Sequence, residues 1–195
     1  MGVSMVYDPD KHHRRSIRLP SYDYASVGAY FATVCAHDRA RIFGEVADGA
    51  MHLARIGNIV DECLKAIPEH FENVIVDAAI VMPNHVHVIL VIAKRDERAR
   101  GITGASGNGM ATRRFIAPGP GSVGTILGTF KAAATREVNQ PRVKGFILWQ
   151  RSFYERVIRN DREMNAFREY IELNPLNWRK DEHHVEGGKQ SGFQR

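Results

Sequence analysis

The chain has 195 residues, a net charge of +5 and a pI of about 9.4. This length allows one domain with a hydrophobic core and additional arms, and the positive charge permits a polyanionic partner without requiring one. The two cysteines, Cys35 and Cys63, lack the spacing of a disulfide framework or a cysteine-based zinc site, which fits a reducing cytoplasm.

The first third of the chain predicts an arm, a strand, a hairpin and a helix. Basic residues cluster within residues 1–20, which we expect to form an irregular arm. Residues 30–36 are rich in aromatic and β-branched residues, as strands are. An Asp-Gly pair inside residues 43–53 indicates a β-hairpin. Apolar residues recur at helical spacing across residues 54–67 and predict an amphipathic helix.

The most apolar region of the chain is predicted to be a pair of antiparallel strands, residues 74–82 and 85–93, joined by a Pro-Asn turn. The polar residues inside this region argue against a membrane span. The charged N-terminus also lacks the apolar core of a signal peptide. We therefore expect no membrane partner and a cytoplasmic protein.

The second half of the chain begins with residues 94–120, whose Gly and Arg content predicts a flexible insertion. Ser122 is a candidate N-cap for a helix that reaches about residue 138, and residues 153–158 suit a further strand. Asp161 is a candidate N-cap for a last helix, which we expect to end at Pro175.

This order of elements predicts helices packed on a mainly antiparallel sheet, an α+β fold. A single domain is expected over residues 21–178, between the basic arm and a disordered polar tail at residues 179–195.

Two histidines, His85 and His87, flank one valine in the strand predicted over residues 85–93. Alternate side chains of a strand share a face, so both imidazoles project together while Val86 and Val88 point into the core. Two imidazoles on one strand make half of a divalent-metal site. They are equally typical of packed histidines with satisfied hydrogen bonds, and the pattern alone favours neither reading.

The last helix carries Tyr170 and Asn174, which lie one turn apart on the same face. A tyrosine oxygen can attack phosphorus and form a covalent intermediate, and an amide oxygen suits Mg²⁺ or Mn²⁺. The alternative is structural: Tyr170 packs against the sheet and Asn174 caps the helix before Pro175.

Three blocks in this order are more specific than the histidines alone: residues 82–87 (MPNHVH), 148–159 (LWQRSFYERVIR) and 169–175 (EYIELNP). Together they resemble the REP-associated tyrosine transposases, which belong to the single-tyrosine HUH transposases. Residues 14–19 (RRSIRL) and 28–31 (GAYF) also resemble the start of that family. The resemblance extends over about residues 14–178.

The resemblance implies a ferredoxin-like sheet and a role for each site residue. His85 and His87 match the HUH histidines, which bind a divalent metal, Mg²⁺ or Mn²⁺. Tyr170 matches the nucleophile, and Asn174 matches the polar residue that completes the metal coordination. Tyr154 is a rival nucleophile, which ranks second because it lies in a strand-like segment and has no metal-binding partner one helical turn away.

The implied function is metal-dependent cleavage and rejoining of single-stranded or hairpin, REP-like DNA through a 5′-phosphotyrosine intermediate, the activity of a transposase. Such relatives are homodimers or monomers. The residues expected to contact DNA are basic or aromatic: Arg14, Arg15, Trp149, Arg151, Arg156 and Arg159. Trp149 is equally consistent with a core position. The implied activity also predicts an association with the nucleoid.

Two other functions remain open at this stage. One is a catalytically silent protein, derived from a transposase, that only binds DNA hairpins. The other is a histidine-triad nucleotide hydrolase, which is disfavoured because that family places a third histidine at the position that Ile89 occupies here.

Overall fold

Four antiparallel strands form the central sheet of the computed structural model, in the order β4-β5-β1-β6. Their bounds are β1 (Gly28–Cys35), β4 (Val74–Met82), β5 (His85–Ile92) and β6 (Tyr154–Ile158). A separate two-stranded sheet joins β2 (Gly44–Ala47) to β3 (Ala50–Leu53), which is the predicted hairpin. The structure describes residues 24–94, 121–140, 145–181 and 183–184.

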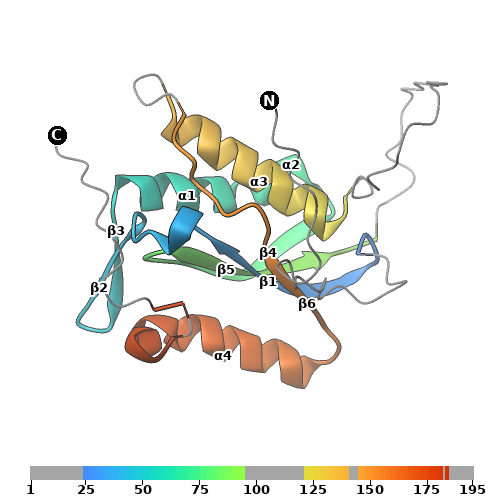
Figure 1. Ribbon diagram of the computed structural model, residues 1–195. Coiled ribbons are helices and arrows are strands. Elements are labelled where there is room, and N and C mark those ends of the chain that lie inside the picture. Colours follow the sequence, from blue (N-terminus) through green and yellow to red (C-terminus); the bar gives the residue numbers. More distant parts are fainter. Residues whose placement is uncertain (1–23, 95–120, 141–144, 182, 185–195) are drawn as a thin grey trace, which may run out of the picture.

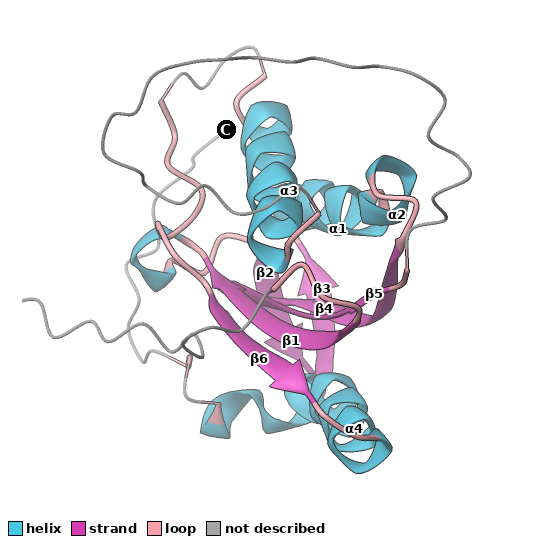
Figure 2. Cartoon of the chain, turned by 90° about the vertical axis from the view of Figure 1, so that its right-hand side faces the viewer, coloured by secondary structure: helices cyan, strands magenta, loops and turns pink. Residues whose placement is uncertain are grey.

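Helices cover both faces of the sheet (Figures 1 and 2). One face carries α1 (Arg55–Lys65), the short α2 (Ile67–His70) and α3 (Val123–Val138); the other carries α4 (Asp161–Asn177). The chain order β1-α1-β4-β5-α3-β6 and the sheet order together are those of a ferredoxin-like fold. The predicted α+β fold class is therefore confirmed.

The central strand β5 separates two hydrophobic clusters. Val86 and Val88 lie in the larger cluster, which contains buried residues of α1 and α3, as the strand alternation predicts. Ile89 points the other way, into a smaller cluster with Phe31 of β1 and Ile171 of α4. The odd-numbered residues of β5, among them His85 and His87, thus face α4.

Ion pairs connect α4, the helix that carries Tyr170, to the two edge strands of the sheet, β4 and β6. Arg168 of α4 donates from Nε to Asp77 Oδ2 of β4 over 2.7 Å, with a second bond from Nη2 to Oδ1. A β-bulge between Val76 and Ala78 leaves Asp77 as the extra residue. At the other edge, Arg156 of β6 donates to Glu163 of α4 over 3.1 Å.

The last helix differs from its predicted limits. Its N-cap is Asn160, whose side chain accepts from the Glu163 amide at 2.9 Å, so Asp161 is the first helical residue rather than the cap. The helix also continues through Pro175 and leads into a 3-10 helix, Trp178–Lys180. Burial of Trp178, which is 6% exposed, offsets the backbone bond that Pro175 cannot donate.

The C-terminal boundary differs as well, because the 3-10 helix Trp178–Lys180, Asp181 and His183 pack against the domain where we expected a tail from residue 179. The remaining tail at residues 185–195, the arm with Arg14 and Arg15, and the predicted insertion apart from Lys94 lie outside the described residues. No described helix has the length and apolar run needed to cross a bilayer.

Candidate functional site

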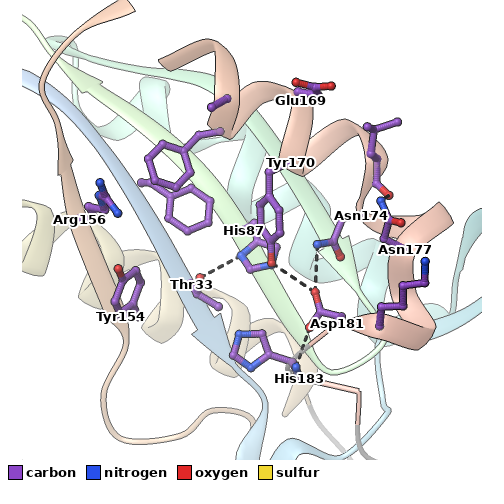
Figure 3. Close-up of a pocket in the computed structure, with 15 residues that line it drawn as sticks. Thr33, His87, Tyr154, Arg156, Glu169, Tyr170, Asn174, Asn177, Asp181 and His183 are labelled. Carbon is purple, nitrogen blue, oxygen red and sulfur yellow. Dashed lines mark hydrogen bonds between the residues drawn. The ribbon is translucent and has the colours of Figure 1, made fainter. Parts of the chain in front are cut away.

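The two histidines of β5 converge on one point beneath α4. His85 Nε2 and His87 Nε2 are 2.9 Å apart, and the two side chains are 0% and 1% exposed. The structure therefore places both imidazoles on one face, as the spacing of the pair predicts. Figure 3 shows His87 between Tyr170 on one side and Thr33 on the other.

The tautomer of His85 follows from the contacts of its neighbour Asn84. The Asn84 amide Nδ2 donates to two backbone carbonyls, those of Arg39 at 3.2 Å and His183 at 2.9 Å. Its Oδ1 must then face His85 Nδ1, 2.9 Å away, and accept a hydrogen bond from it. A proton on Nδ1 leaves the lone pair of His85 on Nε2, directed into the site.

Both imidazoles are neutral at physiological pH. Burial, followed by the neighbouring His87, lowers the pKa of His85 far below its ordinary value. Burial also lowers the pKa of His87, to about 3, although the Asp181 carboxylate opposes that shift. His87 Nδ1 is hydrogen-bonded to Thr33 Oγ1 at 2.9 Å, a contact that fixes the orientation of the ring. Neutral imidazoles with oriented rings are the form that binds metal.

Tyr170 reaches the histidines from the facing helix. Its hydroxyl Oη is 3.3 Å from His87 Nε2 and donates to Asp181 Oδ2, also at 3.3 Å. The Tyr170 and His87 rings are 5.1 Å apart, and Tyr170 stays 40% exposed. The fold thus brings a solvent-accessible phenol to the histidine pair from 83 residues along the chain.

Asp181 is a third candidate metal ligand at this point. The ligand atoms of His85, His87 and Asp181 all lie within 4.8 Å of one another. Asp181 is held in place by its own hydrogen bonds: Asn174 Nδ2 donates to Oδ2 at 3.1 Å, and the His183 amide donates to Oδ1 at 2.6 Å. Asn174, the predicted third ligand, lies next to Asp181 and is buried.

The donor set fits a divalent metal. Two ligands in a right-angled arrangement around a metal at 2.0–2.1 Å are about 3 Å apart, which is the separation of the two Nε2 atoms. Asn174 Oδ1 is buried and has no hydrogen-bond partner, although a buried carbonyl oxygen ordinarily has one. Two imidazole nitrogens, a carboxylate and an unpaired amide oxygen together satisfy the ligand preferences of several divalent cations.

A cavity of about 870 Å³ opens in front of these residues. Its walls come from β1, β5, β6, α4 and the segment after α4, and aromatic side chains make up much of them: Phe31, Tyr154, Phe167 and Tyr170. Arg156 also lines it, with its guanidinium 5.6 Å from the centre of the Phe167 ring. Arg156 and the rival nucleophile Tyr154 therefore lie beside the histidine site.

Trp149 is not placed to stack on DNA, which corrects the prediction made for it. The side chain is 7% exposed, its ring lies 5.3 Å from Phe43 and 5.5 Å from Phe130, and its Nε1 donates to the Lys131 carbonyl. It therefore belongs to the core on the α3 side. Arg151 and Arg159 are exposed, and neither lines the cavity.

Three residues of the site were not predicted: Thr33, Asp181 and His183. Thr33 pairs with His87 across β1 and β5, and no sequence pattern marks it. The His183 ring lies 4.6 Å from that of His85. Asp181 and His183 follow the last helix in a segment without periodicity; a carboxylate seven residues after Asn174 was the available signal.

The sequence matches no family model. Over 187 residues the chain is 34% identical to an uncharacterized protein of Haemophilus influenzae, a match that spans 94% of this chain and 100% of that protein. The chain therefore belongs to the same family as the Haemophilus protein.

Two solved structures resemble the fold. One is a REP-associated tyrosine transposase bound to a REP hairpin, with a TM-score of 0.54, 16% identity and coverage of 85% of this chain and 74% of that chain. The other is described as a transposase from Deinococcus radiodurans, with a TM-score of 0.41, 14% identity and coverage of 80% and 96%. The first likeness shows that the chain has the fold of a REP-associated tyrosine transposase, as the resemblance of its motifs implied.

Proposed function

We propose that the protein cleaves and rejoins single-stranded or hairpin DNA, with Tyr170 as the nucleophile and a divalent metal at His85 and His87. The observation that carries the proposal is the position of the Tyr170 hydroxyl, 3.3 Å from both His87 Nε2 and Asp181 Oδ2. A nucleophile and a metal site must meet at one phosphate to act together, and a separation above about 10 Å would have prevented this.

The chain's own residues account for the attack and its reversal. Tyr170 Oη forms a bond to phosphorus while the bond from phosphorus to the 3′ oxygen breaks, and the phenol proton passes to solvent water. Asp181 Oδ2 already accepts the hydrogen bond from Tyr170 and orients the hydroxyl for attack. The leaving 3′ oxygen takes a proton from solvent water and stays as a hydroxyl. Attack by this hydroxyl on the 5′-phosphotyrosine rejoins the strand without an external energy source.

The metal would be held by His85, His87 and Asp181, with Asn174 Oδ1 as a fourth ligand. When bound, it would polarise the scissile phosphate and offset the negative charge that develops on its oxygens. Asn84 and Thr33 orient the two imidazoles, and Asn174 also orients Asp181. The mixture of nitrogen and oxygen ligands is compatible with Mn²⁺ and Mg²⁺, the cations that the motif resemblance implies.

An adduct assay tests this chemistry. The protein is incubated with a labelled DNA hairpin that carries single-stranded flanks, with Mn²⁺, Mg²⁺ or EDTA, and resolved on a denaturing gel. We expect a covalent protein–DNA band that requires metal, is absent in Tyr170→Phe and persists in Tyr154→Phe. The opposite pattern in the two variants would make Tyr154 the nucleophile. Hairpin binding without any metal-dependent band would favour the catalytically silent DNA-binding protein.

A further inference from the structure

We propose that the cavity between β6 and α4 binds one unpaired nucleotide of the DNA strand, whose base stacks on Tyr154 and whose phosphate meets Arg156. This inference deepens the proposed function, because it assigns a substrate-binding subsite beside the same histidines. It also gives the rival tyrosine a different task from nucleophilic attack.

The size of the cavity indicates more than a metal site. Its volume is about 870 Å³, and pockets for small organic ligands range from about 300 to 1,000 Å³. A cation and one phosphate need only a small part of this space. The rest adjoins the histidines and has room for a nucleoside attached to that phosphate.

The position of Tyr154 makes it a stacking surface next to the reacting phosphate. Tyr154 of β6 pairs directly with Thr33 of β1, and Thr33 is hydrogen-bonded to His87. Side chains of directly paired residues begin about 5 Å apart, so only Thr33 separates Tyr154 from the metal-binding histidine. Figure 3 shows Thr33 between Tyr154 and His87. Tyr154 is exposed, so a base can stack on its ring. Such stacking does not depend on the DNA sequence, since every base has a π-face.

Arg156 supplies positive charge on the same side of the cavity. It lies two residues after Tyr154, so both side chains leave the same face of β6. Its guanidinium is held against Phe167 and by one bond from Nη2 to Glu163. A guanidinium has five N–H donors, and a fixed orientation is favourable for binding a phosphate at little further cost in entropy. Lys180 adds a second cation to the cavity wall.

Binding of DNA in EDTA tests the subsite independently of cleavage. The probes are a fluorescein-labelled oligothymidylate and an abasic strand of the same length, and the readout is fluorescence anisotropy. We expect Tyr154→Ala to weaken oligothymidylate binding by about 5- to 150-fold, the range that loss of one stacked base corresponds to, while abasic-strand binding stays within about twofold. Tyr154→Phe keeps the ring and should show the wild-type difference in affinity between the oligothymidylate and the abasic strand.

The salt dependence of binding tests the contact between Arg156 and a phosphate. Arg156→Ala should reduce the slope of log affinity against log salt concentration by about 0.7, the value for one phosphate of a single strand, while the exposed Arg162→Ala of α4 leaves it unchanged. Thermal unfolding checks that each variant is folded. If Tyr154→Ala loses affinity for both probes equally, or for neither, the stacking role is wrong. If the salt-dependence slope of Arg156→Ala is unchanged, the phosphate contact is wrong. These outcomes do not depend on adduct formation, so the subsite and the cleavage chemistry fail or stand separately.

Discussion

Replacement of Asn84 by alanine tests how the turn before β5 prepares the metal site. The Asn84 side chain makes three hydrogen bonds: buried ones to the His183 carbonyl and His85 Nδ1, and a partly buried one to the Arg39 carbonyl. Truncation removes one donor from each of the two carbonyls and the acceptor of His85 Nδ1, in a place where Asn84 itself is 0% exposed. Each buried group left unsatisfied costs about 1–3 kcal/mol, and water that enters the vacated volume recovers part of this. We expect the free energy of unfolding to fall by about 2–4 kcal/mol.

The same variant should bind Mn²⁺ about 10- to 100-fold more weakly, the usual effect of removing a residue that orients a metal ligand. Urea unfolding gives the stability and titration with Mn²⁺ gives the affinity. The matched control is Asn58→Ala, since Asn58 of α1 is exposed and its side chain donates to the carbonyl of the N-cap residue Ala54. Its stability should change by less than about 0.5 kcal/mol. An Asn84→Ala protein that matches this control in both measurements would refute the proposed orientation of His85.

Three further substitutions have separable outcomes. Asp77→Asn breaks the contact with Arg168 and should lower stability by no more than about 1 kcal/mol at pH 7, because the pair is partly exposed. The hydrogen bond from Arg168 lowers the pKa of Asp77, so the pair stabilises the folded state above the ordinary carboxyl pKa and this stabilisation is lost as the pH falls. The unfolding midpoints of wild type and variant should therefore converge as the pH falls below about 4. A difference that stays constant with pH would contradict this. Trp149→Ala truncates a core residue and should lower the free energy of unfolding by about 3–5 kcal/mol. Trp149→Phe should keep the DNA affinity of the wild type, and a loss of affinity in a folded Trp149→Phe protein would support the stacking prediction after all. Asp181→Asn keeps the side-chain volume but removes the charge, so calorimetry should record at least tenfold weaker Mn²⁺ binding, and unchanged binding would exclude Asp181 as a ligand.

Much of the fold and half of the site could be predicted because they depend on local periodicity. The alternation of β5 placed His85 and His87 on one face, and the spacing of four placed Tyr170 and Asn174 on one face of α4. The order of strands and helices then limited the topology, since short connections favour antiparallel neighbours.

The rest of the site depends on contacts between distant residues, which periodicity does not report. Asp181 lies in an irregular segment whose position is fixed by the bond from Asn84 to His183, across 99 residues. Trp149 has arginines nearby in sequence and so resembled a surface residue, but its bridge to Ala36 turns the ring into the core. Pro175 would ordinarily end a helix, yet packing of Trp178 extends the chain past it to the site.

Identification of the adducted tyrosine tests the central claim most directly. The covalent protein–DNA complex is digested with nuclease and then trypsin, and mass spectrometry locates the residual nucleotide. Tyr170 and Tyr154 fall in different tryptic peptides, residues 169–179 and 152–156. We expect a nucleotide linked through its 5′-phosphate to Tyr170 in the first peptide. The same modification on the second peptide, with Tyr170 unmodified, would contradict it.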